Sequence, residues 1–253
     1  PVICEDFFRH KAYALRAAWL EHEGTAVYLA GLRLDQARNW REFREAMYKH
    51  YCPSLNMVYA DVEGNIGWFG GSIAPLRPNW NGLLPVPGDG RFEWKGFLDT
   101  KRLPYMYNPE EGFFATANQY NVPEGYPRLD VPAHEWAQPS RFNRIAEVLR
   151  SGGKHSVESM MRLQLDEVSL LAREITPLLA NLHSPNPEVG RALRYLREWD
   201  FSLAKESIPA AIYEIWALFL QDTVARMYIP EEARAIFGSL ETRLLVRLIT
   251  SPD

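Results

Sequence analysis

The sequence predicts an α+β fold, with strands and loops over residues 1–138 and helices over residues 139–253. The first observation is a hairpin pattern at residues 58–69, where two apolar segments flank a tight turn. The second is a change after Pro139, where apolar residues begin to recur every three or four positions, the period of an amphipathic helix. The third is size, because 253 residues of which 47% are hydrophobic can bury a core in one large domain or two modest ones.

The first elements along the chain are a strand and a helix. Residues 11–22 are rich in apolar and aromatic side chains and are expected to form a strand. Residues 38–50 have apolar side chains at helical spacing. Near the start of this segment, Asn39 and Glu42 can form a capping box. We therefore expect a helix that begins near Asn39.

The hairpin follows this helix directly. Gly64 and Asn65 supply its turn because both residue types tolerate positive φ, and Asp61 and Asn65 are expected to close it by Asx-type hydrogen bonds. Residues 70–109 are crowded with Pro and Gly, so no regular element is expected there, although their Trp, Phe and Leu residues favour an ordered loop over a core. Residues 112–119 are then expected to form another strand.

The second part of the chain is predicted to be helical throughout. Ser and Asn residues at cap positions and Gly or Pro residues at the ends mark the separate elements. Pro177 is expected to interrupt the third helix, and the fifth, which is apolar on most sides, is placed at the centre of this part. The predicted helices cover residues 140–153, 156–166, 169–182, 186–199, 208–228 and 230–249.

Several classes of function have no support in the sequence. The net charge is −4 without a block of Lys and Arg, which argues against nucleic-acid binding, and the longest apolar runs are too short to cross a bilayer. The six His show no zinc-ligand spacing, no G-x-S-x-G is present, and the Gly-rich residues 64–71 lack the Lys-Ser/Thr of a phosphate loop. Cys4 and Cys52 could pair or remain free thiols.

Five segments, in this order, carry a resemblance to a known family. They are "NWREF", "NMVYADVEGNIGWFGG", "PVPGDGRFEWKG", "YNPEEGFFATANQ" and "PSRFNRI". Together they resemble the penicillin acylase (penicillin amidase) family of N-terminal nucleophile hydrolases, and the similarity continues more weakly to about Leu182. The resemblance implies a four-layer αββα sandwich made from two chains of one precursor, of which this chain looks like an interior part of the larger, β chain. The implied partners are the α chain, the N-terminal part of the β chain and a small N-acyl substrate, and the implied location is the periplasm or outside the cell.

The resemblance also implies a mechanism. The family's nucleophile is a Ser at the N-terminus of the β chain, whose own α-amine, with an unperturbed pKa of about 7.7–8.0, accepts the hydroxyl proton. Because position 1 is Pro, we expect that Ser upstream and expect the isolated chain to be inactive. The complete protein is expected to cleave a linear amide through an acyl-enzyme, the amide being a penicillin side chain, an acyl-homoserine lactone or another N-acyl compound.

Four residues match functional positions of the family. Asn118 matches the oxyanion-hole Asn, although the family usually repeats Asn where this chain has Gln119. Arg141 matches an Arg that orders the nucleophile's surroundings; since a cation at a helix start is unfavourable, we expect it to have a specific partner. Leu55 matches a position lining the acyl pocket. Asp130 matches a Ca²⁺ ligand, but one carboxylate cannot hold this cation alone, so no cofactor is expected beyond a structural Ca²⁺ in the complete enzyme.

Two other interpretations remain open at this point. The chain could be a non-catalytic module of the acylase fold whose helices from Phe142 onward serve assembly or binding. Separately, we expect the isolated chain to self-associate through unpaired sheet edges. Alternatively, the secondary amine of Pro1 could act as a base, as in small tautomerases. Those proteins are short and built from βαβ units, whereas this chain is long and shows no such pattern.

Overall fold

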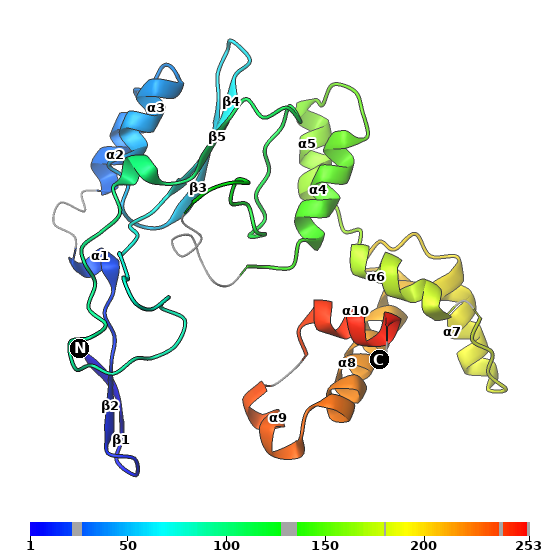
Figure 1. The fold of residues 1–253 in the computed structure, drawn as a ribbon. Helices are drawn as coiled ribbons and strands as arrows, with labels where there is room; N and C mark the ends of the chain where they lie inside the picture. The colour runs from blue at the N-terminus through cyan, green and yellow to red at the C-terminus, as the bar shows by residue number, and fades with distance from the viewer. Residues whose placement is uncertain (22–26, 128–135, 180, 238–239, 252–253) are drawn as a thin grey trace. The chain divides into compact units, whose positions relative to one another are not determined.

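The computed structural model describes residues 1–21, 27–127, 136–179, 181–237 and 240–251 (Figure 1). The chain forms two compact units. The first unit comprises residues 1–116 and 120–136, and the second comprises residues 117–119 and 137–253. All described strands belong to the first unit and all helices from residue 140 onward to the second, which is the α+β arrangement predicted from the sequence.

The first unit begins with a two-stranded antiparallel ribbon. Strand β1 (Val2–Asp6) pairs with β2 (Lys11–Ala14), with Val2 opposite Ala14 and Asp6 opposite Lys11. The strand predicted over residues 11–22 is therefore right only for its first four residues, and the chain turns into helix α1 (Ala18–Glu21). Ala, Leu and Glu in this stretch are strong helix formers, and that local preference prevails over the apolar pattern.

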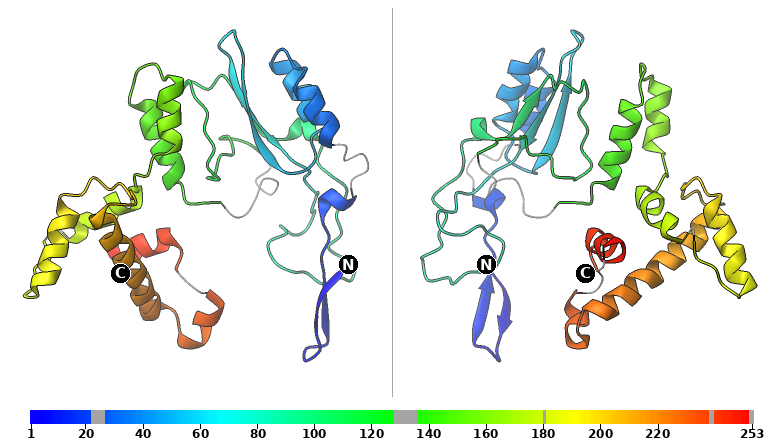
Figure 2. Two further views of the ribbon diagram at one scale, coloured as in Figure 1. Left: turned by 180° about the vertical axis from the view of Figure 1, so that it is seen from behind. Right: turned by 45° about the vertical axis from the view of Figure 1, so that its right-hand side comes forward.

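A three-stranded antiparallel sheet forms the centre of the first unit. Its order is β3 (Leu55–Ala60), β4 (Ile66–Gly71) and β5 (Tyr105–Tyr107), with helices α2 (Val27–Leu34) and α3 (Trp40–Met47) on one side (Figures 1 and 2). Side chains of α3, of strands β3 and β4 and of the loops between β4 and β5 share one core: Phe43, Met47, Tyr59, Phe69, Ala74, Leu98 and Leu103. The opposite face of the sheet carries Trp68, which is 2% exposed.

The predicted helix start and hairpin are confirmed. The Asn39 side chain accepts a hydrogen bond from the Glu42 backbone N–H at 3.0 Å, while the Glu42 carboxylate accepts from the Arg38 backbone N–H. In the hairpin turn, Asp61 Oδ1 accepts from the Asn65 N–H at 2.9 Å and Asp61 Oδ2 accepts from the Asn65 side-chain amide at 2.9 Å. These donors lower the pKa of Asp61, so the turn is held by an ionised carboxylate at neutral pH.

Two expectations for the middle of the chain are wrong. Residues 70–109 are mostly irregular, but they contain the short helix η1 (Thr100–Arg102) and strand β5, which pairs with β4. Residues 112–119 form no strand, because Gly112 and Asn118 adopt positive φ of 73° and 65°. Such backbone angles break the extended conformation that a strand requires.

The second unit consists of helices, as predicted. They are α4 (Ser140–Arg150), α5 (Val157–Gln164), α6 (Leu170–Ile175), η2 (Thr176–Leu179), α7 (Pro187–Arg197), α8 (Ile208–Tyr228), α9 (Glu231–Phe237) and α10 (Thr242–Thr250). The side chains of Ser156, Ser169, Asn186 and Ser207 each accept a hydrogen bond from a backbone N–H of the first turn that follows. Pro177 lies where the α-helical turns end at Ile175 and tighter 3₁₀ turns follow.

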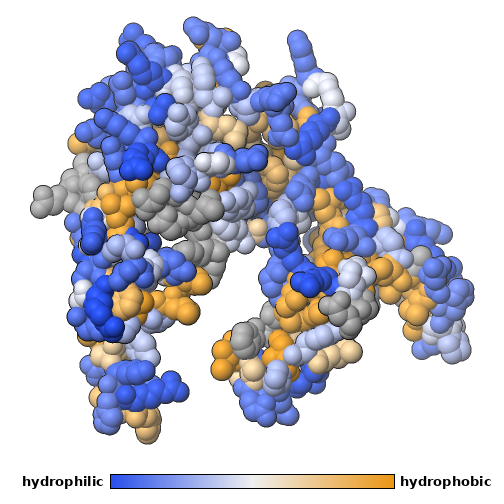
Figure 3. All heavy atoms as spheres, viewed as in Figure 1, coloured by the Kyte–Doolittle hydropathy of each residue, from blue (hydrophilic) through white to orange (hydrophobic). Residues whose placement is uncertain are grey.

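Helix α8 contributes to both cores of this unit. Ala210 and Tyr213 pack in a cluster with Ala172, Ile175, Leu196 and Trp199, and Val224 and Ala225 pack in a second cluster with Leu240 and Leu245. The predicted last helix is instead two, α9 and α10. Apolar side chains also reach the surface of both units (Figure 3). Among the described residues, no helix is both long and apolar enough to span a bilayer.

A network of ion pairs joins helix α4 to helix α6 and to the loop that precedes α6. Arg144 of α4 donates to both carboxylate oxygens of Asp166 at 2.9 and 2.7 Å, and Arg173 of α6 pairs with Glu147 of α4. The hydrogen bonds from Arg144 hold the pKa of Asp166 below its usual value. The side chains of Arg144 and Asp166 are only 23% and 18% exposed, so solvent screens this pair less than a surface pair.

Candidate active site

Ala117–Gln119 form a tight loop that presents one exposed side chain between two buried residues. Ala117 and Gln119 are 7% and 5% exposed, whereas Asn118 is exposed and has φ of 65°. The Gln119 side-chain carbonyl accepts a hydrogen bond from the Ala117 N–H at 2.7 Å, and the Asn118 carbonyl accepts one from the Ala137 N–H at 2.8 Å. These bonds support the left-handed conformation of Asn118, which Asn adopts more readily than most residues.

Arg141 completes this loop from the first turn of α4. Its Nη2 donates to Asn118 Oδ1 at 2.8 Å and to the Ala117 carbonyl at 2.9 Å. The positive end of the helix dipole makes a cation unfavourable here, and the two carbonyl oxygens compensate for it. Arg141 thus has the specific partners expected from its position, and the structure brings the two residues that we selected as catalytic into direct contact.

The contact with Arg141 sets the orientation of the Asn118 amide. A guanidinium only donates hydrogen bonds, so the oxygen of the amide faces Arg141 and its nitrogen faces away. Among the residues that the structure describes, none accepts a hydrogen bond from Asn118 Nδ2. The loop therefore holds a side-chain N–H donor in a fixed direction at an exposed position, and a donor held in this way can stabilise an oxyanion that forms beside it.

Gln119 is the residue at this loop that the sequence interpretation left unassigned. The repeated-amide pattern could not tell which of the two adjacent positions faces outward. A buried side chain at 119 and an exposed one at 118 favour Asn118 as the outward-facing amide. The signal available in the sequence was weak, because Gln and Asn differ by a single methylene.

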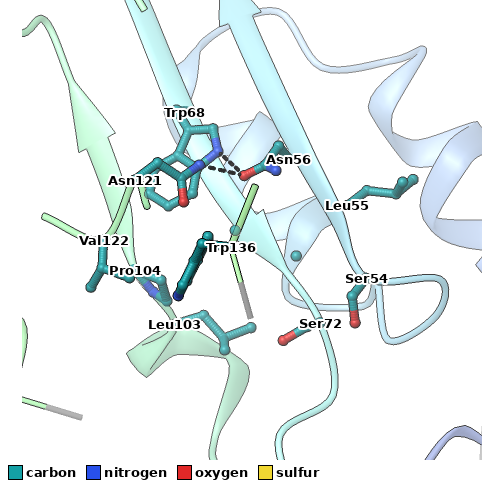
Figure 4. A pocket seen from close by; sticks show the side chains of 12 residues that line it. Ser54, Leu55, Asn56, Trp68, Ser72, Leu103, Pro104, Asn121, Val122 and Trp136 are labelled. Carbon is teal, nitrogen blue, oxygen red and sulfur yellow. Dashed lines mark hydrogen bonds between the residues drawn. The ribbon is translucent and has the colours of Figure 1, made fainter. Parts of the chain in front are cut away.

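A separate cavity lies in the first unit, beside the sheet face opposite α3 (Figure 4). Its volume is about 180 Å³, and none of the described residues that line it is charged. Its apolar walls are formed by Leu55, Trp68, Leu103, Pro104, Val122 and Trp136. Its polar side chains are Ser54, Asn56, Ser72 and Asn121. A neutral, largely apolar cavity suits an uncharged apolar group.

The structure also bears on the other residues matched by the resemblance, Leu55 and Asp130, and on metal ligands and the cysteines. Leu55 lies on the wall of this cavity, 45% exposed, so a role in acyl binding stays a prediction. Asp130 lies outside the described residues. Within the described part of the chain, no group of three or more His, Cys, Asp or Glu could hold a metal ion, and Cys4 and Cys52 are free thiols.

Comparison with known proteins places this geometry in one family. The model of the penicillin amidase family matches residues 1–252. The chain is 35% identical over 193 residues to the acyl-homoserine lactone acylase QuiP of Pseudomonas syringae pv. syringae, covering 70% of this chain and 23% of that protein. It is 32% identical over 191 residues to the penicillin G acylase of Escherichia coli, covering 75% of this chain and 21% of that protein.

A solved structure agrees with these sequence relationships. The thermostable penicillin G acylase from Alcaligenes faecalis matches with a TM-score of 0.79 and 25% identity, over 100% of this chain and 51% of that one. The fold is therefore that of an N-terminal nucleophile hydrolase, of which this chain provides a part. The chain spans about a quarter of the length of the curated relatives that it matches. By the match of the family model and by the resemblance of its motifs, the chain belongs to the penicillin amidase family.

Proposed function

We propose that the complete protein to which this chain belongs hydrolyses linear amides through an acyl-enzyme, and that Asn118 donates a hydrogen bond to the oxyanion. The observation that carries the proposal is the contact between Arg141 Nη2 and Asn118 Oδ1, because it directs the amide N–H groups away from the guanidinium. The named relatives, an acyl-homoserine lactone acylase and a penicillin G acylase, support an N-acyl substrate.

The proposed reaction has two steps. A Ser hydroxyl contributed from outside these 253 residues adds to the amide carbonyl carbon, and its proton passes to the α-amine of the same Ser. The carbonyl oxygen becomes an oxyanion that accepts from Asn118 Nδ2. The C–N bond then breaks, the amine departs with the proton, and water cleaves the resulting ester to release the acid and restore the hydroxyl.

Arg141 acts in this scheme as a positioning residue. It touches Asn118 and the Ala117 carbonyl, and its charge polarises the Asn118 amide without contacting the reacting atoms. The Gln119 side-chain carbonyl and the Ala137 N–H hold the same loop by hydrogen bonds to its backbone. A donor whose orientation is fixed before the reaction pays little reorganisation cost when the oxyanion forms.

The cavity of the first unit is proposed to receive the acyl group. Leu55 lines it, and its volume of about 180 Å³ compares with the cavity of about 150 Å³ that holds benzene in another protein. A phenylacetyl group or a short linear acyl chain has a suitable size. Among the described residues that line the cavity, none is charged, so none of them would pair with a dicarboxylate or a cationic acyl group.

The test uses the complete, processed protein and a panel of N-acyl para-nitroanilides. Asn118→Ala should lower turnover by about 10²–10³-fold while the protein stays folded. Its thermal unfolding temperature should fall only slightly, because Ala is less suited than Asn to the φ of 65° at this position. Asn143→Ala, at an exposed position of α4, is the matched control and should leave turnover unchanged. Unchanged turnover in Asn118→Ala would remove this residue from the site. If the complete protein hydrolyses no member of the panel, the non-catalytic module becomes the better explanation.

A further inference from the structure

A chain of hydrogen bonds sets the polarity of the side chains at one end of the cavity (Figure 4). Trp68 Nε1 donates to Asn56 Oδ1 at 2.8 Å. An indole N–H only donates, so the oxygen of the Asn56 amide must face Trp68. Trp68 itself is held in place, because it is 2% exposed and its ring stacks on Phe114 with centroids 5.2 Å apart.

This first orientation determines a second one. Asn121 Nδ2 donates to the same Asn56 Oδ1 at 2.8 Å. The reverse orientation of Asn121 would bring two carbonyl oxygens together, which is unfavourable. The Asn121 oxygen therefore points away from Asn56, toward the side of the cavity where Trp136 lies (Figure 4). In the described part of the chain, no donor forms a hydrogen bond to Asn121 Oδ1.

The cavity thus presents one oriented acceptor within largely apolar walls. The hydroxyls of Ser54 and Ser72 also line it, but a hydroxyl rotates and both donates and accepts, so it does not discriminate between donors and acceptors. The nitrogen of the Asn121 amide is turned toward Asn56, so the end of the amide that points away from Asn56 is its oxygen. A ligand group that can donate satisfies this oxygen, whereas an aliphatic or unsubstituted aromatic group leaves it without a partner.

We propose that Asn121 is a specificity-determining residue that selects acyl groups carrying a hydrogen-bond donor, a hydroxyl or an N–H, over apolar acyl groups of the same size. The proposal rests on the proposed function, because it assigns the acyl group to this cavity. Trp68 and Asn56 act indirectly, by holding the Asn121 amide in the orientation that exposes its oxygen.

The experiment compares para-nitroanilides of phenylacetic acid and of its ortho-, meta- and para-hydroxy derivatives on the complete protein. The three isomers place the hydroxyl at three positions around one ring of nearly constant size. We expect kcat/KM for one isomer to exceed that for the phenylacetyl compound by about 3–10-fold, the value of one net hydrogen bond. Asn121→Leu, which keeps the approximate size and removes the acceptor, should abolish this preference while phenylacetyl hydrolysis continues.

Three further variants test whether Asn56 orients the Asn121 amide and whether Ser72 accounts for the preference instead. Asn56→Asp keeps an acceptor for both Trp68 and Asn121 and should retain the preference, whereas Asn56→Leu frees the Asn121 amide to rotate and should weaken it. Ser72→Ala should leave the preference intact. Thermal unfolding of each variant checks that the fold is preserved.

The outcomes distinguish failure of the inference from failure of the proposed function. Hydrolysis of the anilides with equal rates for all isomers, or a preference lost in Ser72→Ala but kept in Asn121→Leu, would overturn the inference and leave the function intact. If no anilide is hydrolysed, calorimetric titration with the four free acids gives the same comparison. A hydroxy acid that binds about 3–10-fold tighter than phenylacetate only when Asn121 is present supports the selectivity, and equal or undetectable binding of all four acids refutes it.

Discussion

Replacing Arg141 by Ala tests whether this residue works by orienting Asn118. The substitution removes the donor to Asn118 Oδ1 at 2.8 Å and the donor to the Ala117 carbonyl at 2.9 Å. The Asn118 amide then loses the partner that fixes its orientation. The loop itself remains tied by the hydrogen bonds of Gln119 and Ala137, so we expect the fold to persist.

The contacts that the substitution removes set an upper and a lower bound on the loss of turnover. The upper bound is complete loss of the oxyanion donor, about 2.7–4 kcal/mol or 10²–10³ in turnover. The lower bound is the net value of one ordinary hydrogen bond, about 0.5–1.5 kcal/mol. Arg141 is exposed, so solvent and salt screen the electrostatic effect of its charge on the site. We therefore expect kcat to fall by about 10–100-fold with KM nearly unchanged, and by about 3–10-fold in Arg141→Lys, which keeps the charge but not the planar fork.

A double-mutant cycle on the complete protein provides the assay. Turnover of one para-nitroanilide is measured for the parent, Arg141→Ala, Asn118→Ala and the double variant. If Arg141 acts through Asn118, its removal should change the Asn118→Ala protein by less than about 3-fold, since interacting residues are not additive. Independent, multiplicative losses would refute the reasoning, because they would mean that Arg141 contributes by another route.

Three further predictions concern stability and association. Gly67→Ala should destabilise the protein by about 1–3 kcal/mol in denaturant unfolding, because the added Cβ would lie 2.6 Å from the Trp40 ring, whereas Gly88→Ala, with no atom within 4 Å, should not. Asp166→Asn should cost about 1–2 kcal/mol at pH 7. Because the folded-state pKa of Asp166 is depressed, its contribution should be present above about pH 4 and vanish as the pH falls through the folded pKa, so equal losses in thermal melts at pH 7 and pH 2 would contradict it. The isolated chain should self-associate through its exposed ribbon, where Phe8 is 100% exposed, and a clean monomer by light scattering at high concentration would argue against this.

The helices were predictable from the sequence because their determinants are local. A cap such as Ser156 or Ser207 lies within a few residues of the N–H that it satisfies, and apolar spacing specifies the buried face. The hairpin was predictable for the same reason, since Asp61 bonds to Asn65 only four positions away. The last helix was more difficult, because its amphipathic pattern continues across the interruption between α9 and α10.

The middle of the chain was less predictable because its partners are distant in sequence. Strand β5 has only three residues and exists because it pairs with β4, some forty positions earlier. The stretch at 112–119 has a strand-like composition, but Phe114 stacks on Trp68 and the backbone turns at Asn118. Composition reports how well side chains suit a sheet, and it carries no information on whether an edge is available to receive them.

The candidate site shows the same division more sharply. The resemblance of motifs selected Asn118 and Arg141, but only the structure provides the hydrogen bond between them and the buried position of Gln119. An N–H donor stabilises an oxyanion best when its direction is fixed before the reaction. For an amide, that direction depends on whether its oxygen or its nitrogen is already hydrogen-bonded to the protein. The same argument applies to Asn121, whose oxygen is exposed because Trp68, 53 positions earlier, can only donate. In both places a donor-only side chain sets the orientation of an amide, directly at Asn118 and through Asn56 at Asn121. We propose that the free end of each of these two amides faces the substrate.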